Sequence, residues 1–375
     1  MENASTLKVL LVAEGSGGHL IPALQVAGAL AKTGVHATVW YAKRRYTAPL
    51  ADALVKEAAA ADVDVRAIPL ETGRNFLGRL WQCGQLWSRS RRWFDAVSPD
   101  VVVGFGGWVS ASVILAARQR HIRCVLHEQN VAIGRANRLL VRWVDRVAVS
   151  FRETQAALNG TPSVVTGMPV REAIGQPSRA QHAARFGFSA QRPTLLILGG
   201  SQGSRAINRL LLEMLEHVWP DERQRWQFFH VTGAADEALV REAYARARAT
   251  AWVAPFVVDM ESAYAQADVV IGRAGASTIT ELARCGTPAI LIPYPYAGGH
   301  QVANARLVES IGGGLLIEER HATAARLLSA IRTLFADECL RVMMGRQMRA
   351  AAIPDAADRL RRAIVELHPA VPAEG

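Results

Sequence analysis

One segment of the chain carries residues suited to holding a nucleotide. The apolar run Asp268–Gly272 is followed by a glycine-containing turn and a predicted helix that begins near Ala276. The N–H groups and positive dipole end of such a helix can bind a diphosphate, and Glu281, one turn further, can accept both hydroxyls of a ribose. Gln301 adds an amide able to read sugar hydroxyls. The segment predicts a nucleoside diphosphate site, although a plain strand, turn and helix with a solvated glutamate fits the same pattern.

Two more glycine-rich loops, Gly15–His19 and Gly199–Ser204, each follow an apolar run and precede a predicted helix. Their glycines let backbone N–H groups approach phosphate oxygens. Neither loop matches the dinucleotide fingerprint well, which disfavours a nicotinamide enzyme. Two phosphate sites would suit a phosphorylated donor and a phosphorylated acceptor.

Polar or flexible residues follow further apolar runs. His19, at the start of the first predicted helix, suits a base that deprotonates a hydroxyl, a phosphate ligand or a capping residue. Gly104–Ser110 offers a backbone-rich surface, although its glycines also suit tight packing of a strand against a helix. His127–Asn130 places four hydrogen-bonding side chains at a strand end, which favours a site over a core position.

The stretch from Phe76 to Phe94 interleaves tryptophans with arginines. An interfacial helix has this composition, because its apolar face enters the headgroup boundary while its arginines meet anionic lipid. A core helix whose arginines reach outward is the alternative. The residues predicted to contact a membrane are Leu77, Leu80, Trp81, Trp87, Arg89, Arg91, Arg92 and Trp93.

Composition excludes several classes of protein. With 375 residues and 50% hydrophobic content the chain can bury a large core, so it is neither disordered nor fibrous. A net charge of +10 favours a polyanionic partner: nucleic acid, an anionic membrane or phosphorylated substrates. The four cysteines are scattered, which fits a reducing cytoplasm. Neither a plain secretion signal nor a membrane span is expected.

Nothing in the sequence requires a metal or another cofactor. The one D-x-D motif, Asp62 to Asp64, precedes a predicted strand instead of ending one and is interpreted as solvated.

Short apolar runs alternate with helical segments and then the pattern restarts at Thr194, as in parallel strands buried on both faces. We therefore expect an α/β protein with two Rossmann-like, doubly wound domains facing a cleft. The predicted domains are residues 1–166 and residues 167–353. Residues 354–375 are expected to form a helix and tail that pack back across the cleft or cap the second domain.

Together these motifs resemble the MurG family of N-acetylglucosaminyltransferases, which have the GT-B fold. The resemblance runs nearly end to end and rests on the combination and order of the motifs, namely Gly15–His19, Gly104–Gly107, His127–Asn130, Gly199–Gly203, Ala276–Glu281 and Gln301 with Asn304–Ala305.

The resemblance implies an inverting transfer of N-acetylglucosamine, without a bound metal, from UDP-N-acetylglucosamine to the 4-hydroxyl of undecaprenyl-diphospho-N-acetylmuramoyl-pentapeptide, a step of peptidoglycan synthesis. Its partners would be these two substrates and anionic lipid of the cytoplasmic leaflet, not nucleic acid. The enzyme would be cytoplasmic and peripherally bound to the inner membrane.

The resemblance also assigns the acceptor and the membrane to residues 1–166, the UDP-sugar to residues 167–353, and roles to single residues by motif position. Glu281 is expected to bind the ribose and take part in catalysis, and His19 is the candidate base or acceptor-phosphate ligand. The acceptor would contact Gly104, Gly106, Gly107, His127 and Glu128. The donor would contact Ser16, Gly17, Gly18, Asn130, Arg171, Ser201, Gln202, Val257, Ala276, Ser277, Thr278, Ile279, Thr280, Glu281 and Gln301.

Three positions depart from the family pattern. Glu14 replaces a usual glycine and would repel an acceptor phosphate unless it turns away, Met168 replaces an asparagine, and Ala297–His300 varies the segment before Gln301. These departures bear on specificity more than on reaction type. The alternatives are a transferase acting on another lipid, a UDP-sugar epimerase, and a binding protein without catalysis.

Overall fold

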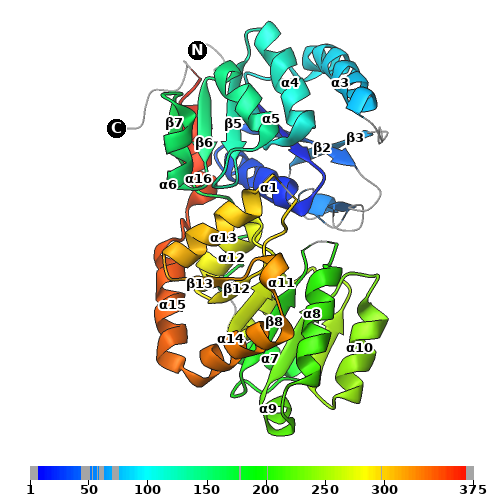
Figure 1. Ribbon diagram of the computed structural model, residues 1–375. Coiled ribbons are helices and arrows are strands. Elements are labelled where there is room, and N and C mark those ends of the chain that lie inside the picture. The colour runs from blue at the N-terminus through cyan, green and yellow to red at the C-terminus, as the bar shows by residue number, and fades with distance from the viewer. Residues whose placement is uncertain are drawn as a thin grey trace. The chain divides into compact units, whose positions relative to one another are not determined.

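The computed structural model describes residues 7–43, 51–52, 54–56, 58, 63–69, 76–176, 179–200, 202–296 and 298–368, without the side chains of residues 69, 76, 77, 79 and 80. The chain divides into two compact units (Figure 1). Unit 1 takes in the chain up to Arg171 and the stretch from Asp355, and unit 2 runs from Glu172 to Pro354. Each unit is a parallel sheet with helices on its faces, so the predicted fold class is confirmed.

Unit 1 contains a seven-stranded sheet in the order β3-β2-β1-β4-β5-β6-β7. The strands are β1 (Lys8–Glu14), β2 (His36–Lys43), β3 (Asp64–Pro69), β4 (Val101–Gly104), β5 (Arg123–Glu128), β6 (Arg146–Val149) and β7 (Ser163–Val165). The helices are α1 (Gly17–Ala31), α3 (Phe76–Val97), α4 (Gly107–Gln119), α5 (Arg135–Leu140), α6 (Arg152–Gln155) and α16 (Ala356–Val365), with short 3-10 turns η2 (Val141–Trp143) and η3 (Ala156–Leu158).

The central strand β1 shows why these runs form a buried sheet. Its residues alternate between two apolar layers, because successive side chains of a strand point to opposite faces. Val9 and Leu11 belong to the cluster that α1 and α16 cover, and Leu10 and Val12 to the cluster that α3 and α4 cover. A strand covered on both faces must be apolar throughout, which the run Val9–Val12 is.

Unit 2 contains a six-stranded sheet in the order β10-β9-β8-β11-β12-β13. The strands are β8 (Thr194–Leu198), β9 (Gln227–Val231), β10 (Thr250–Ala254), β11 (Val269–Gly272), β12 (Ala289–Leu291) and β13 (Gly314–Leu316). The helices are α7 (Arg179–Ala183), α8 (Arg205–Glu216), α9 (Pro220–Arg225), α10 (Glu237–Arg246), α11 (Met260–Gln266), α12 (Ala276–Cys285), α13 (His300–Ser310), α14 (Ala324–Ala336) and α15 (Glu338–Ala350), with 3-10 turns η4 (Ala184–Phe186) and η5 (Glu319–His321).

Each sheet has a point at which the strand order reverses. It lies between β1 and β4 in unit 1 and between β8 and β11 in unit 2. Ligands of doubly wound sheets bind beyond the carboxyl ends of the strands at such points. The loops that follow these four strands are therefore where a site is expected.

The last described helix, α16, belongs to unit 1. Leu360 and Ile364 are fully buried in the cluster that also contains residues of α1. Arg146 of β6 donates to the carbonyl of Ala363 at 3.0 Å and pairs with Glu366 at 2.6 Å. Figure 1 shows this helix in red beside strands of unit 1.

Candidate active site

In unit 1, the loops after β1 and β4 meet through a carboxylate. Oε1 of Glu14, the last residue of β1, accepts the backbone N–H of Trp108 at 3.2 Å, in the first turn of α4. Gly107 makes this approach possible, because a Cβ there would lie 2.3 Å from that oxygen. The carboxylate that was expected to repel an acceptor phosphate unless it turned away is thus directed at a helix amino end.

His19 lies in the first turn of α1. Its Nδ1 and the hydroxyl of Ser16 are 3.0 Å apart, so Ser16 fixes the imidazole ring. The other nitrogen, Nε2, lies 3.6 Å from where a Cβ of Gly106 would be. When the Nδ1 proton is donated to Ser16, Nε2 carries the lone pair and can act as a base toward a group beside Gly106. The structure therefore brings His19, Ser16 and the Gly104–Gly107 loop together.

Glu128, at the end of β5, holds a loop. Its side chain is buried, and Oε1 accepts the N–H of Asn130 at 2.9 Å. Oε2 accepts the N–H of Gly134 at 2.9 Å and the side-chain amide of Asn137 at 2.8 Å. Both oxygens serve the protein's own donors, so the geometry gives Glu128 a positioning role for Asn130. Its contact with an acceptor stays a prediction.

His127 is fully buried beside the same loop. Its Nε2 lies 3.1 Å from the carbonyl of Gly167 and its ring packs on Phe105. Burial lowers the pKa of His127 to about 4, against the raising effect of the Gly167 carbonyl and with a smaller lowering effect from His19. The ring is therefore neutral at physiological pH, and it packs in the core behind the loops instead of presenting a charge to a ligand.

In unit 2, the glycine-rich loop after β8 approaches the backbone of the next loop closely. A Cβ on Gly203 would lie 2.1 Å from the carbonyl oxygen of Thr232, and one on Gly199 would lie 2.3 Å from the N–H nitrogen of Ser204. Only glycine allows this path. Ser204 then caps α8 by accepting the N–H of Ile207 at 3.4 Å. Of the predicted donor residues in this loop, Gln202 is exposed and Ser201 lies outside the described residues.

The helix that carries Glu281 begins as the sequence predicts, directly after β11. Gly275, which has no side chain, is the N-cap of α12, and the first turn contains no acidic residue. Asn304 of α13 donates to the carbonyl of Ala274 at 2.9 Å and so fixes the turn before the helix. This amino end suits an anion.

Glu281 is buried on α12 and receives a hydrogen bond. The hydroxyl of Tyr264, on α11, donates to Oε2 of Glu281 at 2.8 Å. The bond orients the carboxylate. The remaining donor residues predicted on this helix, Ala276 to Thr280, occupy its first turns.

Two more predicted donor residues lie in unit 2. Gln301, in the first turn of α13, accepts the N–H of Tyr294 through Oε1 at 2.9 Å. Val257 is buried in the loop that follows β10. Of the donor residues assigned to unit 1, Ser16, Gly17 and Gly18 open α1, Asn130 follows β5, and Arg171 is the half-buried residue at which the unit ends.

Arg273 was missed at the level of the sequence. It directly follows β11 and donates to the carbonyl of Ile292 at 3.0 Å and to the hydroxyl of Ser204 at 2.9 Å. It also pairs with Glu319. The sequence feature that could have indicated its role is a single arginine directly after an apolar run. Its contacts join the loops that follow β8, β11, β12 and β13, four neighbouring strands of the sheet.

Comparisons with known proteins agree with this geometry. The family model of the glycosyltransferase family 28 N-terminal domain matches residues 9–149, and that of the C-terminal domain matches residues 194–360. The UDP-N-acetylglucosamine--N-acetylmuramyl-(pentapeptide) pyrophosphoryl-undecaprenol N-acetylglucosamine transferase of Syntrophotalea carbinolica is 37% identical over 372 residues, covering 95% of this chain and 98% of the relative.

The chain belongs to the MurG family.

A solved structure supports the family assignment. The crystal structure of Acinetobacter baumannii MurG has a TM-score of 0.74 at 28% identity and covers 96% of this chain and 99% of that one. A putative UDP-N-acetylglucosamine 2-epimerase from Listeria monocytogenes has a TM-score of 0.75 at 13% identity, covering 99% and 98%, which shows a shared fold alone. The chain is thus a family 28 glycosyltransferase with the two-domain GT-B fold.

The MurG-family chain carries exposed tryptophan on α3, the predicted interfacial helix. Trp81 is 63% exposed, and Arg89, Arg91 and Arg92 are exposed as well. Trp87 and Trp93 are half-buried and pack on the cluster beneath the helix. The side chains of Leu77 and Leu80 lie outside the described residues. The helix is therefore both a core element and a carrier of exposed cationic and aromatic groups.

Sequence reasoning missed a second such group on α5 and η2 of the same unit. Leu139 is 58% exposed and Trp143 is 49% exposed, and Arg135, Arg138 and Arg142 on these elements are exposed too. Their alternation over nine residues was a visible but weak signal. Among the described residues, no helix is long and apolar enough to cross a bilayer.

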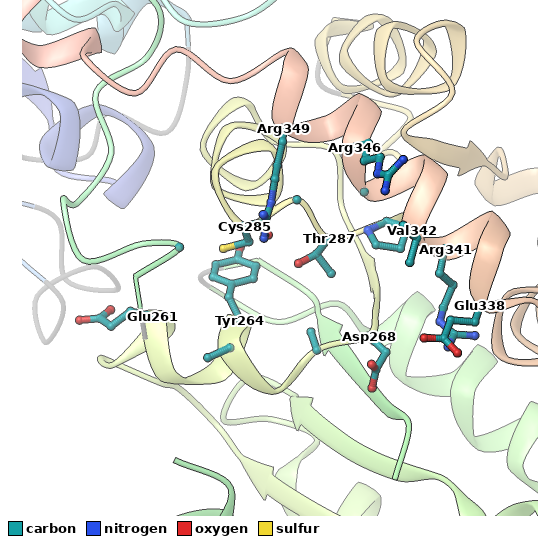
Figure 2. Close-up of a pocket in the computed structure, with 16 residues that line it drawn as sticks. Glu261, Tyr264, Asp268, Cys285, Thr287, Glu338, Arg341, Val342, Arg346 and Arg349 are labelled. Carbon is teal, nitrogen blue, oxygen red and sulfur yellow. The ribbon is translucent and has the colours of Figure 1, made fainter. Parts of the chain in front are cut away.

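A pocket of about 500 Å³ lies at the other end of the unit 2 strands, where β11 and β12 begin (Figure 2). Asp268 and Thr287 line it, together with Arg341, Arg346 and Arg349 of α15. Burial raises the pKa of the Cys285 thiol in its wall to about 12, so this thiol is not a nucleophile at neutral pH. The pocket is separate from the amino end of α12 and from the donor residues predicted there, Ala276 to Thr280.

Proposed function

We propose that this protein transfers N-acetylglucosamine from UDP-N-acetylglucosamine to the 4-hydroxyl of undecaprenyl-diphospho-N-acetylmuramoyl-pentapeptide, with inversion at the anomeric carbon. The observation that carries the proposal is the amino end of α12, where a helix start with a glycine N-cap and no acidic residue in its first turn precedes an oriented, buried glutamate in a MurG-family chain.

Unit 2 supplies the donor site. The first N–H groups of α12 bind the diphosphate, Glu281 accepts the ribose hydroxyls and Gln301 contacts the sugar. As the bond between the anomeric carbon and UDP breaks, negative charge grows on the diphosphate. N–H donors already aimed at it stabilise this charge more in the transition state than in the ground state.

Unit 1 supplies the acceptor site. The 4-hydroxyl oxygen attacks the anomeric carbon and its proton passes to Nε2 of His19, whose ring Ser16 holds. Gly104, Gly106 and Gly107 bind the acceptor's diphosphate through their backbone. Glu128 positions Asn130 through the contacts that organise the loop after β5.

Unit 1 also binds the membrane that contains the acceptor. The exposed side chains on α3, α5 and η2 combine aromatic rings with arginines, which suits the boundary of an anionic leaflet. The protein then acts as a peripheral enzyme on the cytoplasmic face of the inner membrane.

The test is transfer of radiolabel from UDP-N-acetylglucosamine to a short-chain analogue of the lipid-linked acceptor, with EDTA present. We expect labelled disaccharide lipid, and about a hundredfold lower kcat/KM in Glu281→Ala, because a buried carboxylate that binds two hydroxyls contributes several charged hydrogen bonds. Glu216→Ala, an exposed glutamate of α8, is the matched control and retains activity.

Three results contradict the proposal. Equal transfer by the wild type and Glu281→Ala would show that the donor site does not lie at α12. Binding of the UDP-sugar without transfer would point to a different lipid acceptor, and epimerised UDP-sugar in the same mixture would point to an epimerase.

A further inference from the structure

The amino end of α4 is already in contact with an anion of the protein itself. Helix α4 has 13 residues, its N-cap is Gly106, and its first turn contains no acidic residue. The carboxylate that meets its positive end comes from β1, through the 3.2 Å contact between Glu14 and the N–H of Trp108.

The carboxylate lies directly against the first turn. A Cβ on Gly107 would be 2.3 Å from Oε1 of Glu14 and 2.5 Å from its Cγ and Cδ. The volume in front of the turn is therefore filled by the Glu14 side chain. A second anion that approached the same N–H groups would meet this negative charge at short range, where like charges repel strongly.

Resting on the proposed function, we infer that Glu14 is a specificity-determining residue of the acceptor site. Its carboxylate competes with the acceptor's diphosphate for the first N–H groups of α4. An acceptor must displace the side chain to bind there, so Glu14 sets the KM for the acceptor and favours acceptors whose other contacts are strong. With a glycine at this position, the same helix end would carry no such competitor.

The variants Glu14→Gln and Glu14→Gly separate charge from volume. Glutamine keeps the shape of the side chain and an oxygen for Trp108, and removes only the charge. Glycine also opens the space. Because Glu14→Gly can disturb the loop, the result for Glu14→Gln decides the test. Thermal unfolding checks that both variants are folded. Glu153→Gln, an exposed residue of α6 in the same unit, is the matched control.

The first measurement is binding of inorganic pyrophosphate in the presence of saturating UDP, which occupies the donor site. Its reporter is the backbone amide signal of Trp108 in the full chain. We expect about tenfold tighter binding in Glu14→Gly, an intermediate gain in Glu14→Gln and no change in Glu153→Gln. The KM for the lipid-linked acceptor falls in the same order, while the KM for UDP-N-acetylglucosamine changes by less than about twofold.

Unchanged or weaker pyrophosphate binding in both Glu14 variants overturns the inference, whether or not transfer occurs. Tighter binding at Trp108 in a protein that transfers no sugar supports competition by Glu14 and rejects the proposed function alone. Transfer without any gain in pyrophosphate affinity rejects the role of Glu14 and leaves the proposed function standing.

Discussion

Helices α4 and α12 both begin at a glycine N-cap shortly after a buried strand at the switch point of their sheet. They differ in what meets their positive ends. Neither first turn contains an acidic residue. Glu14 reaches α4 from a neighbouring strand, whereas the glutamate of α12 lies further along the helix, where Tyr264 holds it. The charge in front of such a helix start can therefore depend on a residue that is distant in sequence.

The largest expected effect comes from adding one methyl group at the start of each helix, by replacing a glycine with alanine. Gly107→Ala places a Cβ at φ +79°, against the Glu14 carboxylate, and should lower the stability of unit 1 by about 3 kcal/mol. In Gly275→Ala the Cβ has Thr278 Oγ1 at 3.7 Å as its nearest neighbour, and we expect a loss of about 1 kcal/mol or less in unit 2. Hydrogen exchange resolved by unit measures both.

The double variant Glu14→Gly with Gly107→Ala sharpens this comparison. Removing the carboxylate should restore part of the stability lost in Gly107→Ala, because the two side chains collide. Additive losses would show that the strained backbone alone, not Glu14, explains the cost.

Acid should weaken both units through their buried histidines. Burial lowers the pKa of His127 in unit 1 to about 4 and that of His230 in unit 2 to about 3. Between these values and 6.5 the unfolded chain binds more protons than the folded one, so stability is complete above pH 6.5 and falls as the pH drops. At pH 5 each histidine should cost about 2 kcal/mol.

The measurement is unfolding of each unit at pH 7 and pH 5, with His127→Gln and His230→Gln. Each variant should reduce the pH dependence of the stability of its own unit and leave the pH dependence of the other unit's stability unchanged. A pH dependence that survives in the substituted unit would assign acid sensitivity to its carboxylates.

The smallest effect concerns the support of Glu281. Tyr264→Phe removes a donor from its carboxylate, and we expect the KM for UDP-N-acetylglucosamine to rise about fivefold, or about 1 kcal/mol. Tyr244→Phe is the matched control, since Tyr244 is also buried in unit 2 but its hydroxyl contacts His230. Lowered stability with an unchanged KM would reduce Tyr264 to a packing role.

Most of the strands were predictable because parallel strands buried on both faces are continuous apolar runs. Strand β7 was missed, since Ser163–Val165 is only half-buried at the edge of its sheet and has no such run. The start of α12 was predictable because its glycine turn, helix and glutamate are contiguous in sequence.

Contacts between distant segments were not predictable. Glu14 and Trp108 are 94 residues apart and meet only because β1 pairs with β4. The polar residues after β5 showed that hydrogen bonding matters there, but not that Glu128 turns toward Asn130, Gly134 and Asn137. Polarity locates a site, whereas the direction of each side chain depends on the topology.

The position of α16 has a consequence for how the chain matures. Unit 1 starts with β1 but its core needs Leu360 and Ile364, which the ribosome adds after all of unit 2. Unit 2 is contiguous and has every strand of its sheet available earlier. During synthesis the second unit can therefore close first, while the first exposes the apolar face of α1 until the final helix emerges.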